Sequence, residues 1–457
     1  MAQSPLRALV NILSNAVDGI EGVYEKNGAT FPNLDAPYTP SPLEHDPQVM
    51  GLTAVLLGAA FQLMMTVGTP IENITTTYTC QMYMTASLRY VVETSIADVL
   101  KEGDPKGVHV DEIAQKINAK DPALIARVLR YMASRHCFRE VSPNVFAHNK
   151  LSSVLVKTKS FAEIQADPLS QYDGMTASAV VGHTSDEGFK SASHLSEWLQ
   201  DPTSAPHAFG AAFGVPDMWQ WFEQPGNELR RRRFATVMKA IGAGGYPDRI
   251  FTEAIDWKAL PESATVVDVG GNTGSVSLAI AKAHPHLNLV VQDLPQVIDS
   301  LTKPFWSENS PEYVSNGKIK FQPHDFFTPN PTKNVDVFFM RMILHDWSKE
   351  KSVEILTHLR AAAQPSTKLV VFDHIILHAC PDPLMPPENV PNAPWPMLAN
   401  LGYGIGGITT VFDIHMLNLF GGQERTVAEF TELGKLTGWK LEKAIPGPTG
   451  TIVYSAV

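Results

Sequence analysis

A histidine, a carboxylate and an indole stand side by side at His345, Asp346 and Trp347. They close the stretch RMILHDW, which directly follows the apolar run VDVFFM, residues 335–340, and such a run is typical of a buried strand. Ligands of an open parallel sheet bind outside the carboxyl ends of its strands. An imidazole, with an ordinary pKa of ~6.5, can take a proton from a hydroxyl there. The pattern indicates a general base at His345, or a histidine that only caps the helix expected over residues 348–363. Asp346 then has a plainer interpretation, as an acid near the N-terminus of that helix.

A glycine-rich turn follows an earlier predicted strand. The stretch VVDVGGNTGSVSLAIA places Gly270, Gly271, Asn272 and Gly274 between the strand and a helix. Glycines let a backbone pass close to a ligand, and the free N–H groups that open a helix suit an anionic group. By itself this turn fits a dinucleotide, a nucleoside such as S-adenosylmethionine, or tight packing alone.

The ends of the next two predicted strands carry acids. Asp293 closes VVQD about 20 residues after Gly270, where an acid can accept hydrogen bonds from ribose hydroxyls. Asp325 and Phe326 follow the third strand, where they could bind an adenine amino group and cover its ring. The glycine turn holds no basic residue that could meet a phosphate. The pattern therefore favours an adenosine site over a pyrophosphate site.

The motifs DVGGNTG, DLPQVI, HDFF, RMILHDWS and GGQERTVAEF resemble, in order and spacing, those of the S-adenosylmethionine-dependent O-methyltransferases of the plant caffeate and fungal phenol type. The resemblance covers most of the chain. It implies S-adenosylmethionine as cofactor, a small aromatic acceptor and a homodimer formed through N-terminal helices around a winged helix. The cofactor contacts that it implies are Gly270, Gly271, Asp293, Asp325, Phe326 and Arg341.

The same resemblance implies a catalytic group. His345 matches the general base, and Asp373 and Glu424 match two carboxylates that orient it. Asp373 replaces the usual glutamate and is one methylene shorter. Asn272 replaces the usual third glycine of the turn, and asparagine tolerates a positive φ. The acceptor contacts expected by the resemblance, or from nearby aromatic and methionine side chains, are Met218, Trp219, Phe222 and Met416, and no metal site is expected.

Hydrophobic periodicity divides the chain into three parts. Residues 1–48 are predicted to form a helical arm and a proline-rich linker, and residues 49–245 a helical, winged-helix-like dimerisation domain. Residues 246–457 alternate strands with helices, which predicts an α/β, Rossmann-like, doubly wound and mostly parallel sheet with a late antiparallel hairpin. The insert at residues 380–407 is rich in proline and glycine and is either a lid or a tolerated insertion. The basic run Arg230–Arg233 is interpreted as a solvated helix face.

Composition limits the partners and the compartment. The 457 residues carry a formal net charge of -11, which argues against nucleic acid or an anionic membrane as partner. The three cysteines are widely spaced, which favours free thiols and a cytoplasmic protein. Residues 49–68 are apolar enough to imitate a membrane span, but Gln62 interrupts them, so we expect a helix buried between domains or subunits.

Two other functions stay open. Some fungal relatives with this resemblance catalyse pericyclic reactions or dehydrations around a bound S-adenosylmethionine that is not consumed, and the shorter Asp373 keeps that alternative open. A winged helix could also serve a DNA-binding regulator, which the acidic net charge argues against.

Overall fold

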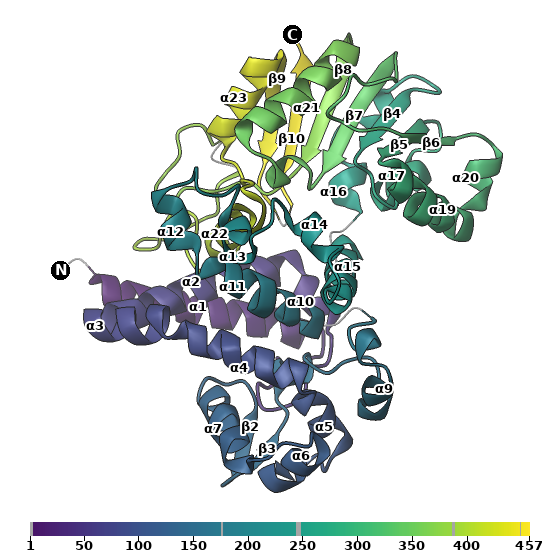
Figure 1. Ribbon diagram of the computed structural model, residues 1–457. Coiled ribbons are helices and arrows are strands. Elements are labelled where there is room, and N and C mark those ends of the chain that lie inside the picture. The colour runs from purple at the N-terminus through teal and green to yellow at the C-terminus, as the bar shows by residue number, and fades with distance from the viewer. Residues whose placement is uncertain (1–2, 175–176, 244–247, 386–388, 448) are drawn as a thin grey trace. The chain divides into compact units, whose positions relative to one another are not determined.

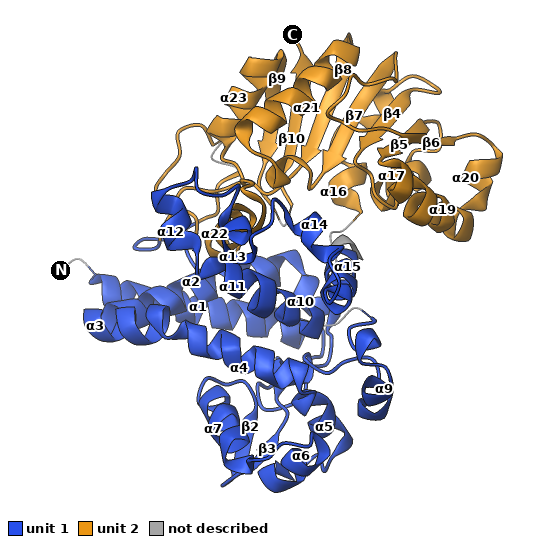
Figure 2. Cartoon of the chain, in the orientation of Figure 1, with its two compact units in different colours: residues 1–244, 393–397, 401–404 blue, residues 245–392, 398–400, 405–457 orange. Residues whose placement is uncertain are grey.

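The computed structural model describes residues 3–174, 177–243, 248–385, 389–447 and 449–457 (Figure 1). The chain forms two compact units, shown in blue and orange in Figure 2. Unit 1 holds residues 1–244, 393–397 and 401–404, and unit 2 holds residues 245–392, 398–400 and 405–457. The boundary predicted at residues 245 and 246 lies outside the described residues.

Two long helices open unit 1. Helix α1 (Pro5–Lys26) begins after Ser4, whose hydroxyl accepts a hydrogen bond from the N–H of Arg7. Its buried side chains, among them Leu9 and Ile20, confirm an amphipathic helix. Helix α2 (Pro47–Val67) packs against it, because Ile20 shares a hydrophobic cluster with residues of α2.

Helix α2 is long and apolar enough to cross a membrane by length and composition. Within the chain, only Val49, Ala54, Gly58 and Ala59 of this helix are buried. Exposed side chains such as Leu57 and Met64 therefore leave an apolar strip that the single chain does not cover.

Part of the predicted insert packs on α2 inside unit 1. The side chain of Gln62 donates a hydrogen bond of 2.9 Å to the carbonyl of Pro396. The rings of Phe61 and Tyr403 stack with centroids 4.7 Å apart. Gly404 lies so close to the backbone of Ala54 that a Cβ would overlap its carbonyl.

The predicted winged helix is present. Helices α6 (Val110–Lys116) and α7 (Pro122–Ala133) are followed by strands β2 (Arg139–Ser142) and β3 (Val145–Ala147), and β3 pairs with both β2 and β1 (Val108–His109). The linker is fastened to this region, since Arg139 donates to the carbonyl of Asp35 and the N–H of Tyr38 donates to Ser153.

The basic run of unit 1 is not a solvated face as a whole. Arg233 on α15 (Glu228–Ala243) is 2% exposed and pairs with Asp186 and Glu187, which lie on the π-helix Thr184–Gly188. Arg230 also pairs with Asp186. The prediction was wrong for Arg233, which is buried, and Arg230 is 28% exposed and paired, because the acids that they contact lie more than 40 residues earlier in the sequence. The other helices of unit 1 are α3 (Pro70–Glu72), α4 (Gln81–Glu93), α5 (Ile96–Glu102), α8 (Lys150–Ser153), α9 (Phe161–Ala166), α10 (Ala177–His183), α11 (Phe189–Ala192), α12 (Leu195–Gln200), α13 (Ala208–Phe213) and α14 (Met218–Phe222).

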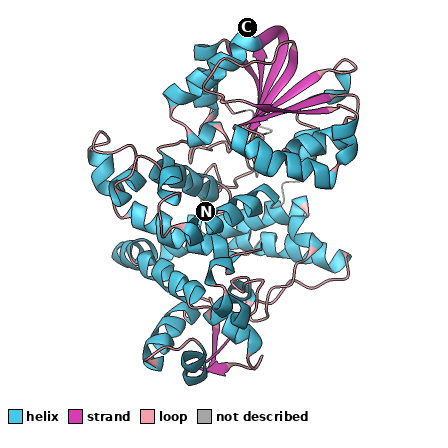
Figure 3. Cartoon of the chain, turned by 45° about the vertical axis from the view of Figure 1, so that its right-hand side comes forward, coloured by secondary structure: helices cyan, strands magenta, loops and turns pink. Residues whose placement is uncertain are grey.

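Unit 2 is built on a sheet of seven strands in the order β6-β5-β4-β7-β8-β10-β9 (Figure 3). The pairs from β6 to β8 are parallel, and β10 runs antiparallel to both β8 and β9. This confirms the predicted Rossmann-like sheet with its late hairpin, whose turn includes residue 448, outside the described residues. The strands are β4 (Thr265–Val269), β5 (Asn288–Asp293), β6 (Ile319–Pro323), β7 (Val335–Arg341), β8 (Ala363–Phe372), β9 (Trp439–Ile445) and β10 (Thr451–Ala456).

Buried residues of each strand alternate between the two faces of the sheet. On β4, Val267 belongs to one hydrophobic cluster and Val266 to the other. The first cluster packs under α21 (Lys349–Ala362) and α23 (Val427–Thr437), and the second under α17 (Ser275–Ala283) and α19 (Lys303–Asn309). The remaining helices of unit 2 are α16 (Arg249–Thr252), α18 (Pro295–Val297), α20 (Pro311–Ser315) and α22 (Gly406–Phe420).

Candidate active site

The glycine turn joins the end of β4 to α17. Its N–H groups at Gly270 and Gly271 donate to the carbonyl of Gln292 on β5, at 2.9 and 3.0 Å. Gly270 has φ +69° and Asn272 has φ 52°, so asparagine does take the positive φ expected of it. A Cβ at Gly270 would lie 2.6 Å from a methyl carbon of Ile343, so a larger residue would have to displace that side chain in addition to adopting a positive φ.

Two acids lie close to this turn. Asp268 is buried, and burial raises its pKa to about 7 although the hydroxyl of Ser277 donates to it at 2.7 Å. Asp293 accepts a hydrogen bond of 2.8 Å from the N–H of Asn272, and burial raises its pKa as well. Asp293 therefore anchors the turn as well as lying where the cofactor is expected.

The residues after β6 lie at the same edge of the sheet as the glycine turn, where the parallel strands end. Asp325 is exposed and accepts a hydrogen bond of 3.0 Å from the N–H of Phe327. The ring of Phe326 is partly buried, 6.0 Å from the ring of Trp347, and one of its edge carbons would lie 3.6 Å from a Cβ at Gly270. An adenosine group fits this edge of the sheet. The edge offers two carboxylates at neighbouring strand ends, an aromatic ring, and a glycine turn without a basic residue. Arg341, the last residue of β7, lies with its guanidinium 5.6 Å from the ring of Phe251.

His345 sits in a short turn between β7 and α21. The turn, Leu344–Asp346, follows Met342, which has φ 53°. The next helix is capped by Ser348, whose hydroxyl accepts from the N–H of Lys351. His345 therefore does not cap this helix.

Arg425 fixes the backbone of this turn by hydrogen bonds to its carbonyl groups. It is 1% exposed and donates hydrogen bonds of 2.7 Å to the carbonyls of Leu344 and Trp347, on either side of His345. The N–H of Gln423 donates to the carbonyl of His345 at 2.8 Å. Gly422 packs so tightly there that a Cβ would overlap the same carbonyl oxygen. The backbone of the histidine turn is thus fixed by the segment that carries Glu424.

The imidazole of His345 faces a carboxylate at each nitrogen. Nδ1 lies 2.8 Å from Oε1 of Glu424, and Nε2 lies 3.4 Å from Oδ1 of Asp346. Because an ionised carboxylate only accepts, Nδ1 carries a proton. Burial alone would lower the pKa of His345, but Asp346, Glu424 and Asp373 together raise it to about 10.

Asp373 lies just past β8 and does not hydrogen-bond His345. It is 1% exposed, and neither carboxylate oxygen has a hydrogen-bond partner among the described residues. Burial raises its pKa. Its neighbour His374 stacks on Phe412 with centroids 5.0 Å apart, and burial together with the nearby charge of His345 lowers the pKa of His374 to about 4. Glu424 is therefore the carboxylate that orients His345 in this structure.

The expected acceptor contacts divide between the units. Met218 and Phe222 of α14 are buried in the chain, Trp219 is 53% exposed, and Phe222 packs 5.1 Å from the ring of Phe234 in unit 1. Met416 on α22 belongs to unit 2 and is 9% exposed.

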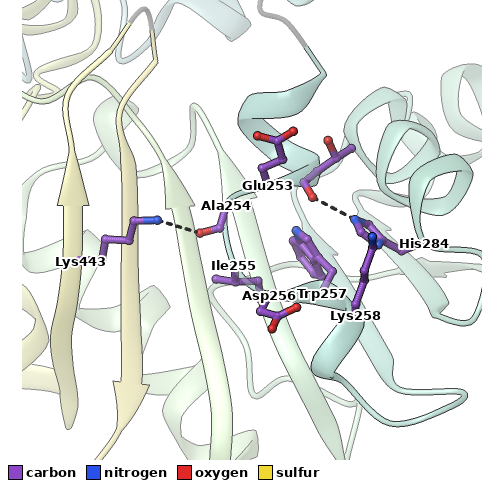
Figure 4. Close-up of a pocket in the computed structure, with 9 residues that line it drawn as sticks. Glu253, Ala254, Ile255, Asp256, Trp257, Lys258, His284 and Lys443 are labelled. Carbon is purple, nitrogen blue, oxygen red and sulfur yellow. Dashed lines mark hydrogen bonds between the residues drawn. The ribbon is translucent and has the colours of Figure 1, made fainter.

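A cavity of about 370 Å³ in unit 2 lies apart from these groups (Figure 4). Its lining includes Trp257, Lys258 and Lys443, and none of the predicted site residues. His284, which also lines it, donates through Nε2 to the carbonyl of Thr252 at 2.9 Å. This histidine has a structural role there.

The chain is similar in sequence to known O-methyltransferases. Residues 192–391 match the model of an O-methyltransferase domain, and residues 76–158 match that of an O-methyltransferase dimerisation domain. A protein of Phanerochaete chrysosporium named 4-O-methyltransferase 1 is 37% identical over 96% of this chain and 95% of its own length. An O-methyltransferase of Armillaria gallica is 36% identical over 97% of this chain and 96% of its own. The chlorophenol O-methyltransferase of Trichoderma longibrachiatum is 31% identical over 83% of this chain and 77% of its own.

Solved structures share the fold. The mitomycin 7-O-methyltransferase MmcR superposes with a TM-score of 0.61 at 22% identity, covering 85% of this chain and 98% of its own. A structure described as a pericyclic reaction enzyme superposes with a TM-score of 0.62 at 18% identity, covering 97% of this chain and 100% of its own. At these identities the likeness shows the fold alone, so the chemistry must be argued from the site.

Proposed function

The chain belongs to the O-methyltransferase family, and from this premise we propose that it moves the methyl group of S-adenosylmethionine to a hydroxyl of a small phenolic metabolite, with His345 as general base. The observation that carries the proposal is the His345–Glu424 pair, 2.8 Å long and buried at the carboxyl end of the sheet. A phenolic acceptor is supported by the relative named chlorophenol O-methyltransferase.

The cofactor would be held by the glycine turn and its neighbours. Asp293 and Asp325 would accept hydrogen bonds from the nucleoside, and Phe326 would cover its base. Gly270 leaves the backbone room to approach it. S-adenosylmethionine, when bound, supplies an electrophilic methyl group on a sulfonium. The residues of this chain need only place a nucleophile in line with it and remove a proton.

His345 would remove that proton through Nε2, because Nδ1 is engaged by Glu424. A phenol has a pKa of ~10, and the carboxylates around His345 raise its pKa to about 10. The two pKa values are therefore matched, and the neutral imidazole, whose fraction increases as pH rises towards 10, takes the proton once the acceptor lies beside Nε2. The buried charge of Glu424 stabilises the imidazolium that forms.

Transfer of label from methyl-labelled S-adenosylmethionine to a panel of phenols tests this function. We expect His345→Ala to lose transfer by about a hundredfold or more while binding the cofactor as wild type does in calorimetry. His378→Ala, which removes an exposed histidine, serves as the matched control and should keep activity. If wild type binds the cofactor but labels no acceptor, and instead rearranges substrates without consuming it, the pericyclic alternative replaces this proposal.

The same proposal includes assembly and location. A homodimer is supported by the dimerisation-domain match and by the uncovered apolar strip of α2 around Leu57 and Met64. Cys80, Cys137 and Cys380 are free thiols, which suits the cytoplasm.

A further inference from the structure

His345 needs a route by which its proton reaches solvent. Each cycle places the acceptor's proton on Nε2, and the next cycle requires that proton to leave. His345 itself is 8% exposed, so water reaches its ring poorly. Nδ1 offers no exit, because the carboxylate that it contacts, on Glu424, is 1% exposed in its side chain.

Asp346 differs from the other acids near His345 in its access to water. Its side chain is 34% exposed, whereas those of Glu424 and Asp373 are buried. It also faces the nitrogen that matters, since Oδ1 lies 3.4 Å from Nε2. The charged and titratable groups around His345 come from three places: Asp346 on its own turn, Asp373 with His374 past β8, and Glu424 with Arg425 before α23. Of these acids, Asp346 is the one that joins the ring to solvent.

We propose that Asp346 is the relay that carries the proton from Nε2 of His345 to solvent in each turnover, an inference that rests on the proposed function. During transfer the acceptor's O–H bond breaks and its proton moves to Nε2, while the acceptor oxygen bonds the methyl carbon as the S–CH3 bond breaks. The Nε2–H bond then breaks in favour of Oδ1 of Asp346, which becomes a neutral carboxylic acid. That acid gives the proton to water or buffer and regains its charge.

The turn is built so that only the side chain of Asp346 needs to move. Its N–H donates to the carbonyl of Ile343, and the carbonyls on either side of the His345–Asp346 pair are held by Arg425. Gly422 packs against its backbone, where a Cβ would lie 2.9 Å from the carbonyl carbon. A rotation about the side-chain bonds of Asp346 can therefore clear Nε2 for the acceptor and return to receive the proton.

The two pKa values make Asp346 a transient carrier of the proton. Burial raises the pKa of Asp346, the charge of His345 lowers it, and Asp373 and Glu424 raise it again, to about 6. Because the pKa of His345 is about 10, transfer from Nε2 to Asp346 is uphill, and a proton on Asp346 at pH 7 either returns to Nε2 or leaves to water. Asp346 lies two residues before Ser348, the N-cap of α21, as expected for an acid near that N-terminus, and its carboxylate also faces Nε2 of His345.

Nitrogen-15 NMR of the full-length, acceptor-free enzyme tests the relay without any activity. In Asp346→Asn, which keeps the shape but cannot take a proton, we expect Nε2–H of His345 to exchange with solvent about tenfold more slowly or worse. His345→Gln assigns the signal. Glu350→Gln, which removes an exposed acid on the first turn of α21, should leave exchange unchanged. Unchanged exchange in Asp346→Asn overturns the proposal, even if the pKa of His345 falls.

Steady-state methylation of the acceptor found in the label assay gives a second reading. Asp346→Asn should turn over about tenfold more slowly or worse, and added imidazole should restore part of the rate by replacing the relay. Asp346→Glu should keep most of the rate. Equal losses in both variants with no effect of imidazole show a structural role and overturn the relay. If wild type methylates no acceptor, the proposed function fails, and the NMR result alone decides the role of Asp346.

Discussion

Replacing Glu424 by glutamine removes one buried charge and little else. The side chain keeps its shape, but Nδ1 of His345 loses a charge-assisted hydrogen bond of 2.8 Å. Such bonds contribute about 1.5–3 kcal/mol, and about 1.4 kcal/mol corresponds to a tenfold change in rate. We therefore expect kcat to fall by about tenfold to a hundredfold, with the affinity for the cofactor unchanged. The same loss should lower the pKa of His345 from about 10 by one to two pH units.

The pH dependence follows with a definite sign. The pKa of folded His345 lies above its ordinary value of 6.5, so its pairing stabilises the fold fully below that pH and ceases to do so as pH rises through about 10. In Glu424→Gln this loss should occur at lower pH, measured by thermal unfolding from pH 6 to 10 and by NMR titration of His345. Glu432→Gln, an exposed acid paired with Lys349, is the control. An unchanged pKa of His345, or an unchanged kcat, refutes the reasoning.

Three more variants test other parts of the structure. Asp293→Ala should weaken cofactor binding by about tenfold or more in calorimetry, because the turn at Asn272 loses its anchor together with the expected ribose contact; unchanged affinity contradicts the cofactor assignment. Gly422→Ala should destabilise the protein by about 1–3 kcal/mol in denaturant unfolding and lower kcat, since the new methyl group pushes on the carbonyl of His345; a variant as stable and active as wild type disproves this contact. Leu57→Glu should convert a dimer to a monomer in light scattering, as it charges the apolar strip of α2; an unchanged mass assigns the interface elsewhere.

The sequence predicted well the features that depend on local order. The apolar run before His345 placed that residue just past the end of β7, because strands end where their buried pattern ends. The positions of the glycine turn and of the acids at the end of β5 and after β6 follow from the same rule, which brings the carboxyl ends of parallel strands to one edge. Asn272 could be placed because few residues other than glycine adopt a positive φ.

Features that depend on distant partners were missed. Arg425 was visible in GGQERT, but its role became apparent only from the carbonyls of Leu344 and Trp347, which lie some 80 residues earlier and carry no side-chain signal. Glu424 matched the motif and Asp373 departed from it by one methylene group, but only the three-dimensional structure shows which of the two acids reaches His345. Arg233 likewise looked like a surface charge until the acids that bury it were located.

The insert limits how segments of this protein can be exchanged with those of a relative. Residues 393–397 and 401–404 belong to unit 1, although the chain on either side of each belongs to unit 2. They pack on α2, with Gly404 against the backbone of Ala54 and the ring of Tyr403 stacked on that of Phe61. A chimera joined once near residue 245 would bring an insert shaped for one α2 to a relative's helix. Exchange of unit 2 between relatives therefore requires α2 and the insert to be transplanted together.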